Sequence, residues 1–153
     1  LSDEAVVEAT KICGLYDDIM AMAEGFDTII GERGVSLSGG QKQRIAMSRA
    51  LIMNPEILIL DDSLSAVDAK TEHLILENLK RERSDKTTMI TAHRLSAIVH
   101  ADLIIVLQDG RIVEKGTHEE LMALGGWYAK TYDRQQLEAT LEEGGSAVEH
   151  EDL

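Results

Sequence analysis

The sequence predicts an α/β fold with a mainly parallel sheet. Apolar runs at Ile57–Leu60 and Leu103–Leu107 show no alternation with polar residues, which is typical of strands buried on both faces of a parallel sheet. A further strand is expected at Thr87–Thr91, and helical patterns alternate with these strands. Residues 1–53 contain no clear strand, so a small helical region attached to a sheet core is the simplest organisation.

Local start and stop signals define the elements that precede Pro55. Ser and Asp side chains can cap helix starts, whereas Gly and Pro end helices. The expected elements are, in chain order, a helix capped by Ser2 and ended by Gly14, a short helix over 15–22, a glycine-rich loop over 24–35, and a helix from Ser38 to about Met53.

After Pro55 the apolar period changes and strands alternate with helices. The expected elements are a strand at Ile57–Leu60, a helix capped by Asp68, a strand at Thr87–Thr91, a short helix at Leu95–His100, a strand at Leu103–Leu107, a tight turn at Asp109-Gly110 into Arg111–Val113, a helix opened by the capping box Thr117–Glu120, and a last helix from Trp127.

Charge and composition limit the functional classes. The net charge is −13, and residues 138–153 hold six acids and no Lys or Arg, so this tail is expected to be solvated and disordered and argues against a nucleic-acid surface. The single cysteine, Cys13, lies on the apolar side of the first helix, which favours a buried and inert thiol. No apolar run approaches the length of a membrane span, and no signal-peptide pattern is evident.

The stretch Leu37–Gln41 places a serine and two glycines at an expected helix start. Backbone N–H groups and the positive end of the helix dipole would point at one spot there, and that arrangement binds phosphate. Taken alone the pattern is weak, because Gly-Gly with Ser is most often a flexible turn.

Two carboxylates, Asp61 and Asp62, close the apolar run of the first strand. Ligands of open α/β sheets bind at the carboxyl ends of strands, and Mg²⁺ with its waters is the natural partner of such acids. The alternative is that Asp61 caps a turn and Asp62 is solvated. His93 ends the next strand, where it would lie beside both acids and could contact a γ-phosphate or an attacking water.

These patterns occur in a fixed order, and together they resemble the nucleotide-binding domain of ATP-binding-cassette (ABC) transporters of the exporter type. Leu37–Gln41 is similar to the family's signature motif, Ile57–Asp62 to its Walker B strand, Ser65–Asp68 to its D-loop and His93 to its switch histidine. Gly31–Gly34 resembles the exporter-specific loop that meets the coupling helices of the membrane domains.

The resemblance implies a P-loop NTPase-like (RecA-like) core, here incomplete, with part of the ABC helical subdomain. Residues 1–53 would be the helical part, 54–137 the C-terminal part of the core, and 138–153 the tail. The phosphate loop Gly-x-x-x-x-Gly-Lys-Ser/Thr is absent. We therefore expect the C-terminal part of such a domain, which alone would bind ATP poorly and hydrolyse it hardly at all. Missing strands would leave apolar strands such as Ile57–Leu60 or Leu103–Leu107 exposed, which would favour self-association.

The resemblance also implies residue roles, with ATP and Mg²⁺ as cofactors. Asp61 would hold Mg²⁺, Asp62 would occupy the position of the catalytic base, and His93 would contact the γ-phosphate. The residues expected to bind nucleotide at the dimer interface are Leu37, Ser38, Gly39, Gly40 and Gln41, which would contact the ATP of a partner domain, and Asp68, which would report between the two sites.

One position departs from the family, because hydrolytically competent members carry Glu where this chain has Asp62. A carboxylate one methylene shorter stands about 1.5 Å further back. A 1 Å misplacement can cost on the order of 10²-fold in rate, so the chain's own site is expected to be slow. An intact signature with an altered base resembles the heterodimeric bacterial multidrug exporters, in which one site is degenerate.

The resulting expectation is part of an ATP-hydrolysing subunit that powers export of drugs or other hydrophobic compounds, at the cytoplasmic side of the cell membrane in a multi-pass parent protein. Its partners would be a second, non-identical nucleotide-binding domain and the transmembrane domains of both half-transporters, with no nucleic acid. One alternative is a soluble ABC ATPase of DNA maintenance, which the Gly31–Gly34 loop and the lack of heptad arms disfavour. The other is a non-hydrolytic regulatory or dimerisation module.

Overall fold

A computed structural model describes residues 2–148, with side chains as far as Glu142. The chain divides into two compact units, 1–92 and 93–153, and each is described by itself. The predicted α/β class is confirmed. The helix before Met53 and the strand after it share one core, and the expected division of the chain near Met53 stays a prediction.

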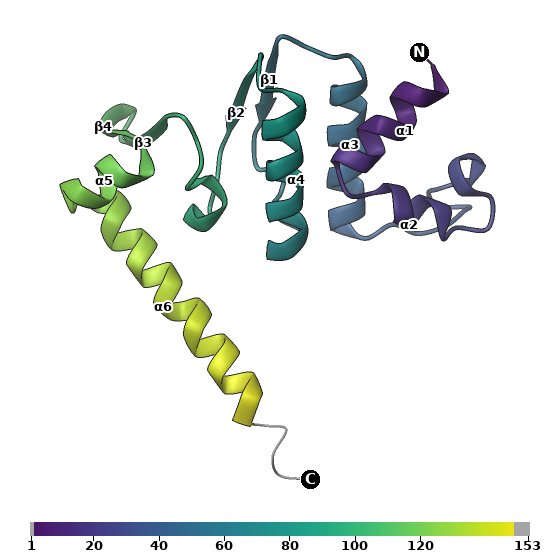
Figure 1. Cartoon of the computed structure of the whole chain (residues 1–153). Helices are drawn as coiled ribbons and strands as arrows, with labels where there is room; N and C mark the ends of the chain where they lie inside the picture. Colours follow the sequence, from purple (N-terminus) through teal and green to yellow (C-terminus); the bar gives the residue numbers. More distant parts are fainter. Residues whose placement is uncertain (1, 149–153) are drawn as a thin grey trace. The chain divides into compact units, whose positions relative to one another are not determined.

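The first unit packs helices against one face of a short parallel sheet (Figure 1). Its elements are α1 (Asp3–Ile12), α2 (Tyr16–Met20), the 3₁₀ helix η1 (Gly25–Asp27), α3 (Gly39–Ile52), β1 (Ile57–Leu60), α4 (Ala69–Glu82) and β2 (Thr87–Ile90). The predicted caps are present: Ser2, Ser38 and Asp68 each accept a backbone N–H of the helix that follows. Gly14 follows α1 with a positive φ of 60°, which suits a residue without a Cβ.

The parallel pair of β1 and β2 has only one buried face in the described chain. The register runs from Ile57 opposite Thr87 to Leu60 opposite Ile90. Leu58 and Leu60 are buried, whereas Ile57 and Ile59 are 61% and 65% exposed. Burial on both faces, which is typical of such a run, is therefore wrong for β1, and the exposure expected where strands of the sheet are missing is found on one of its faces. Helices cover one face of the strand, and in the described residues no layer covers the other.

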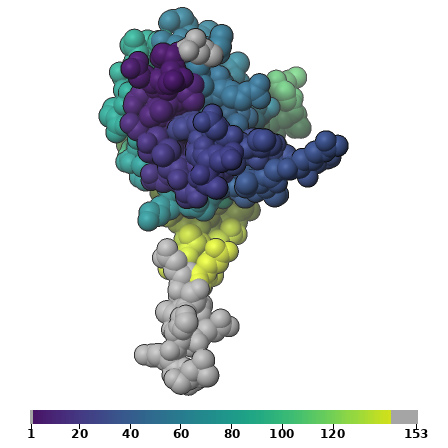
Figure 2. All heavy atoms as spheres, turned by 90° about the vertical axis from the view of Figure 1, so that its right-hand side faces the viewer, coloured from purple at the N-terminus to yellow at the C-terminus, as the bar shows by residue number. Residues whose placement is uncertain are grey.

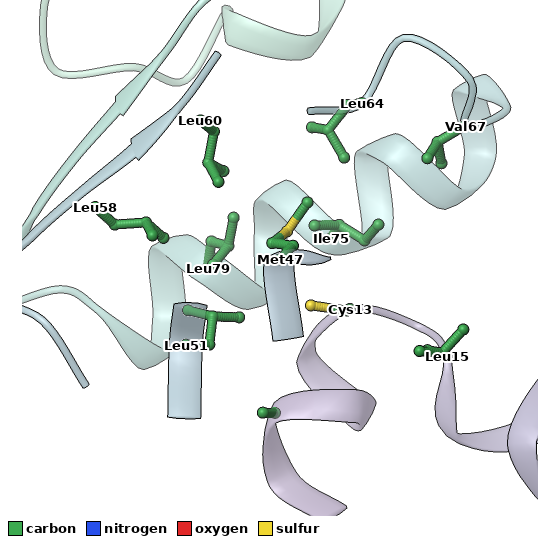
Figure 3. Packing of buried hydrophobic residues seen from close by; sticks show 11 residues of the cluster. Cys13, Leu15, Met47, Leu51, Leu58, Leu60, Leu64, Val67, Ile75 and Leu79 are labelled. Atoms are coloured by element: carbon green, nitrogen blue, oxygen red, sulfur yellow. The ribbon is translucent and has the colours of Figure 1, made fainter. Parts of the chain in front are cut away.

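The core of the first unit lies between the covered face of β1 and the helices α1, α3 and α4 (Figure 3). It is aliphatic, as the low aromatic content requires. Its buried members are Ala9, Cys13, Leu15, Met47, Leu51, Leu58, Leu60, Leu64, Val67, Ile75 and Leu79. Cys13 is fully buried, and desolvation raises the pKa of its thiol from an ordinary 9.0 to about 11. A hydrogen bond with Ser48 and the positive charge of Arg44 lower this pKa by smaller amounts.

The segment between η1 and α3 projects from the surface of the first unit (Figure 2, blue). Its apolar side chains Ile29, Ile30 and Val35 are exposed, and an isolated bridge joins Ile30 to Val35. This segment holds the expected exporter-specific loop, Gly31–Gly34. It lies next to α3 in sequence and forms with it a hollow of about 570 Å³.

The second unit is built on an antiparallel hairpin. Its elements are the 3₁₀ helix η2 (Leu95–Ile98), β3 (Ile104–Gln108), β4 (Arg111–Gly116), α5 (His118–Leu124) and α6 (Trp127–Val148). The capping box at Thr117 is formed as predicted. A buried cluster of Leu95, Ile104, Val106, Leu121 and Tyr128 holds the hairpin to the helices.

Two features of this unit differ from expectation. The run from Leu103 was expected to be buried on both faces of a parallel sheet, but β3 pairs antiparallel with β4, and Ile105 and Leu107 are exposed. The tight turn at Asp109-Gly110 brings β4 back beside β3, which explains the antiparallel pairing. In addition, α6 continues to Val148 and so enters the segment expected to be a disordered tail, whose residues 149–153 lie outside the described chain.

Candidate functional site

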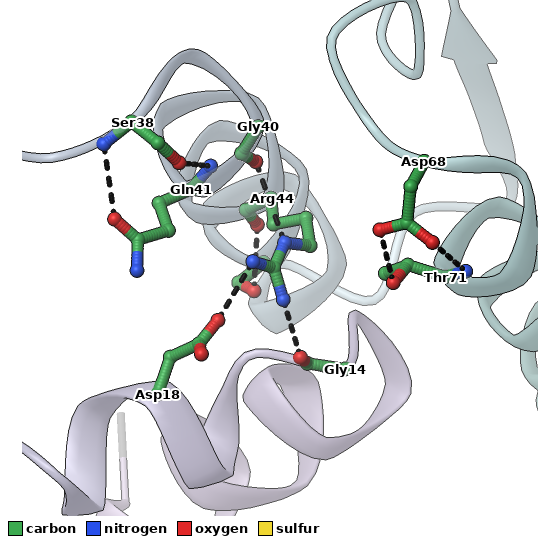
Figure 4. A network of polar contacts seen from close by, with 9 residues as sticks. Gly14, Asp18, Ser38, Gly40, Gln41, Arg44, Asp68 and Thr71 are labelled. Atoms are coloured by element: carbon green, nitrogen blue, oxygen red, sulfur yellow. Dashed lines mark hydrogen bonds and ion pairs between the residues drawn. The ribbon is translucent and has the colours of Figure 1, made fainter. Parts of the chain in front are cut away.

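The start of α3 is a closed capping box (Figure 4). The Ser38 hydroxyl accepts the N–H of Gln41 at 3.1 Å, and the Gln41 side-chain carbonyl accepts the N–H of Ser38 at 3.0 Å. Gly39 and Gly40 form the first turn, where a helix offers N–H groups without intrahelical acceptors. The structure therefore places Ser38, Gly39, Gly40 and Gln41 at a helix start, as predicted, and their binding of an anion stays a prediction. Leu37, half-buried, precedes them.

The two glycines also allow α3 to approach the loop after β1. A Cβ on Gly40 would lie 2.8 Å from the carbonyl oxygen of Ala66, closer than side chains tolerate. A Cβ on Gly39 would meet the Cβ of Ala66 at 3.4 Å, an ordinary contact. Both glycines are predicted to bind phosphate, and the structure adds a packing requirement at Gly40.

Gln43, one turn into α3, forms hydrogen bonds with the same loop. Its amide nitrogen donates to the Ser65 hydroxyl at 2.8 Å and to the Asp62 carbonyl at 3.1 Å. Its amide oxygen accepts the N–H of Ala66 at 2.9 Å. Both ends of the amide are thus used, which fixes its orientation. Gln43 was not predicted from the sequence, although its spacing of three residues from Gly40 places both on one helix face.

Arg44 connects the start of α3 to the first two helices (Figure 4). Its guanidinium donates to the Asp18 carboxylate at 2.7 Å and to the carbonyls of Gly14 and Gly40. The Arg44 side chain is only 13% exposed, so the ion pair is partly shielded from water. The contacts with Asp18 and Gly14 were also not predicted, because these partners lie 26 and 30 residues away in sequence.

Asp61 and Asp62 end β1 as predicted, and Thr91 joins them. The Thr91 hydroxyl donates to the Asp61 carboxylate at 2.9 Å and accepts the N–H of Asp62, also at 2.9 Å. Asp62 has a positive φ of 51°, which turns the chain away from the strand. Both acidic residues are exposed, and a hollow of about 330 Å³ lies beside them between β1 and α3.

The donor chemistry at the end of β1 fits Mg²⁺. In the part of the chain that is described, no three His, Cys, Asp or Glu side chains gather as a ligand set of their own. An exposed carboxylate such as that of Asp61 suits a hard cation that keeps waters and phosphate oxygens as its other ligands. That Asp61 holds Mg²⁺ together with a nucleotide stays a prediction.

Asp68 caps α4 with both of its carboxylate oxygens (Figure 4). One oxygen accepts the Thr71 N–H at 3.0 Å and the other accepts the Thr71 hydroxyl at 2.7 Å. These hydrogen bonds, led by the one from the Thr71 side chain, lower the pKa of Asp68. Its predicted cap is confirmed, and its role between two nucleotide sites stays a prediction.

His93 is the first residue of the second unit. Its backbone carbonyl accepts a hydrogen bond from the Gln135 side chain at 2.8 Å, and Gln135 also accepts the N–H of Leu95. Gln135 of α6 thereby fixes the segment that begins the second unit. The predicted placement of His93 beside the two acids of β1 concerns residues of different units and stays a prediction.

Comparison with known proteins places these features in one family. Residues 11–65, which include the Leu37–Gln41 stretch and both acids of β1, match the family model described as ABC transporter. The chain is 56% identical over 147 residues to YheI of Bacillus subtilis, named a probable multidrug resistance ABC transporter ATP-binding/permease protein. It is 50% identical over 142 residues to the multidrug resistance-like ATP-binding protein MdlA of Escherichia coli.

A solved structure shares the fold. The structure of a bacterial Atm1-family ABC exporter with ATP bound covers 88% of this chain with a TM-score of 0.79 and 43% identity. The matches cover 96% and 93% of this chain against YheI and MdlA, but only 25% and 24% of those relatives and 23% of the solved chain. The chain thus spans about a quarter of the length of the curated relatives it matches. Within the described residues, no helix is both long and apolar enough to span a bilayer.

Proposed function

We propose that this chain, which is part of the nucleotide-binding domain of an ABC exporter, works with a second such domain to bind and hydrolyse ATP. The observation that carries the proposal is the start of α3, where Ser38, Gly39 and Gly40 form a capped helix N-terminus that is held against the loop after β1. A γ-phosphate of ATP is the anion that such a helix start suits. We assign that ATP to the partner domain, and Leu37 and Gln41 flank the contact.

The other set of residues serves this chain's own site. Asp61 would hold Mg²⁺, which when bound neutralises charge on the phosphates. Asp62 stands where a catalytic base orients the attacking water, and His93 would contact the γ-phosphate. Asp68, which is anchored by Thr71, would communicate the state of one nucleotide site to the other. Because Asp62 is one methylene shorter than Glu, hydrolysis at this site is slow.

The unequal sites favour a heterodimer. The chain's own site has an altered base, whereas the other site receives an intact signature from this chain. ATP hydrolysis is therefore unequal between the sites of two non-identical subunits. The named relatives are ATP-binding/permease or ATP-binding proteins of multidrug resistance type. We therefore propose that each subunit carries transmembrane helices, that this domain lies on the cytoplasmic side of the membrane, and that drugs or other hydrophobic compounds are exported.

The experiment reconstitutes the complete exporter in lipid vesicles and measures ATP hydrolysis and transport of a hydrophobic dye. We expect hydrolysis that the dye stimulates and dye movement that requires ATP. The 153-residue chain alone, whose sequence contains no phosphate loop, should show no turnover above background. Clear hydrolysis by the pure chain, or a complete exporter that moves no compound with ATP, would contradict the proposal.

A further inference from the structure

The hydroxyl of Thr91 lies at the junction of the two acids that end β1. Thr91 directly follows β2, and its backbone N–H donates to the Leu60 carbonyl at 3.0 Å, so it extends the parallel ladder by one residue. The side chain of Thr91 therefore stands on an anchored backbone. From there its oxygen is 2.9 Å both from the Asp61 carboxylate and from the Asp62 nitrogen.

The two hydrogen bonds have fixed directions. The N–H of Asp62 can only donate, so it occupies a lone pair of the Thr91 oxygen. The single Thr91 proton then goes to Oδ1 of Asp61. This hydrogen bond holds Asp61 through Oδ1, and since no described residue bonds Oδ2, that oxygen can face another ligand. Asp62 is held through its backbone, in the left-handed conformation that side-chain-bearing residues adopt at a cost.

We propose that Thr91 is a positioning residue that orients the Asp61 carboxylate for Mg²⁺ bound with nucleotide. This inference rests on the proposed function, because it assumes that Asp61 is the carboxylate that holds the metal. Hydrogen-bonding partners behind a metal ligand fix its orientation and raise metal affinity. A second consequence is that Thr91 couples the metal ligand to the turn at Asp62, since one hydroxyl serves both.

The test uses the complete exporter with Mn²⁺ in place of Mg²⁺, and electron paramagnetic resonance counts free Mn²⁺ in a titration with and without ATP. The variant Thr91→Val removes the hydroxyl and keeps the branched shape. We expect its ATP-dependent Mn²⁺ affinity to fall by about 10-fold. Thr91→Ser, which retains the hydroxyl, should restore most of the affinity.

Thr87→Val is the matched control, because Thr87 is an exposed residue of β2, the strand that Thr91 directly follows, and the substitution is the same. Its Mn²⁺ affinity should equal that of the unaltered protein. If Asp61→Asn weakens ATP-dependent Mn²⁺ binding but Thr91→Val does not, the role of Thr91 is refuted while the metal assignment stands. If Asp61→Asn has no effect, the metal assignment within the proposed function fails as well.

Discussion

Gly40 lies so close to Ala66 that a Cβ on the glycine would stand 2.8 Å from the Ala66 carbonyl oxygen. This contact fixes the separation between the start of α3 and the loop that follows β1. The two segments carry different predicted functions, since one holds the signature stretch and the other leads from Asp62 to Asp68. Their spacing is therefore a structural requirement on the proposed nucleotide contacts.

The first prediction concerns Gly40→Ala. Replacing a helical glycine by alanine normally stabilises by about 0.5–1 kcal/mol, whereas overpacking typically costs about 1–3 kcal/mol. Gly39→Ala is the matched control, because its Cβ would make only an ordinary contact at 3.4 Å. Thermal unfolding of the complete exporter should show Gly40→Ala to be the less stable variant, by about 1–3 kcal/mol. Equal stabilities would mean that the close approach is not a constraint.

Gln43 provides the second prediction, because its amide holds three groups of the loop after β1. Gln43→Leu removes all three hydrogen bonds, and amide hydrogen exchange of the loop should become faster. Gln43→Glu keeps an acceptor for the Ala66 N–H but cannot donate to Ser65. Peptide-level exchange should therefore show more protection at Ala66 in the Glu variant than in the Leu variant. The same protection in both variants would exclude this role of the amide.

Cys13 gives a prediction of pH dependence. Its pKa is raised by burial from 9.0 to about 11, so the unfolded chain loses the thiol proton at lower pH than the folded chain does. The contribution of the buried, protonated Cys13 thiol to the free energy of unfolding is complete below pH 9. This contribution is lost as the pH rises through about 11. The free energy of unfolding should fall over this range in the unaltered protein and fall less in Cys13→Ala.

A second measurement tests the burial of Cys13 by its reaction with iodoacetamide at pH 8, followed by peptide mass spectrometry. Cys13 should be labelled only after unfolding, and rapid labelling of the native protein would contradict its burial.

The base position gives the fourth prediction. Asp62→Glu should raise ATP turnover at the chain's own site, by up to on the order of 10²-fold, if the reach of the carboxylate limits the rate. The measurement uses a heterodimer whose partner is inactivated at its own base position, so that only one site turns over. Asp62→Asn, which lacks a base, serves as the control and should not gain. Unchanged turnover in Asp62→Glu would mean that another feature, for example the partner's signature, limits the rate of hydrolysis.

Local signals predicted the helix starts well. Ser38, Asp68 and Thr117 cap helices because each side chain bonds a backbone group three residues ahead, and such a contact is visible in the sequence. The contacts of Gln43 and Thr91 were not predicted, since their partners lie 19 or more residues away. Such contacts depend on how β1, β2 and α3 come together.

Burial was harder to predict than strand position. The run at Ile57–Leu60 forms a strand as expected. Whether the side chains of Ile57 and Ile59 are exposed, however, depends on which elements cover that face of the sheet. The same holds for Leu107, where the hairpin partner rather than the apolar run determined the pairing. An apolar run specifies a strand, but the layers around it are set by the rest of the chain.

In the proposed mechanism, the signature stretch acts on the partner's ATP rather than on the chain's own. The most direct measurement is site-resolved ATP turnover in the heterodimer with Gly39→Asp, which places a carboxylate at the anion-binding helix start, and with Gly39→Ala as the neutral control. We predict that Gly39→Asp abolishes turnover at the partner's site, that Gly39→Ala largely preserves it, and that nucleotide binding at the chain's own site is unchanged. An undiminished rate at the partner's site in Gly39→Asp would contradict the account.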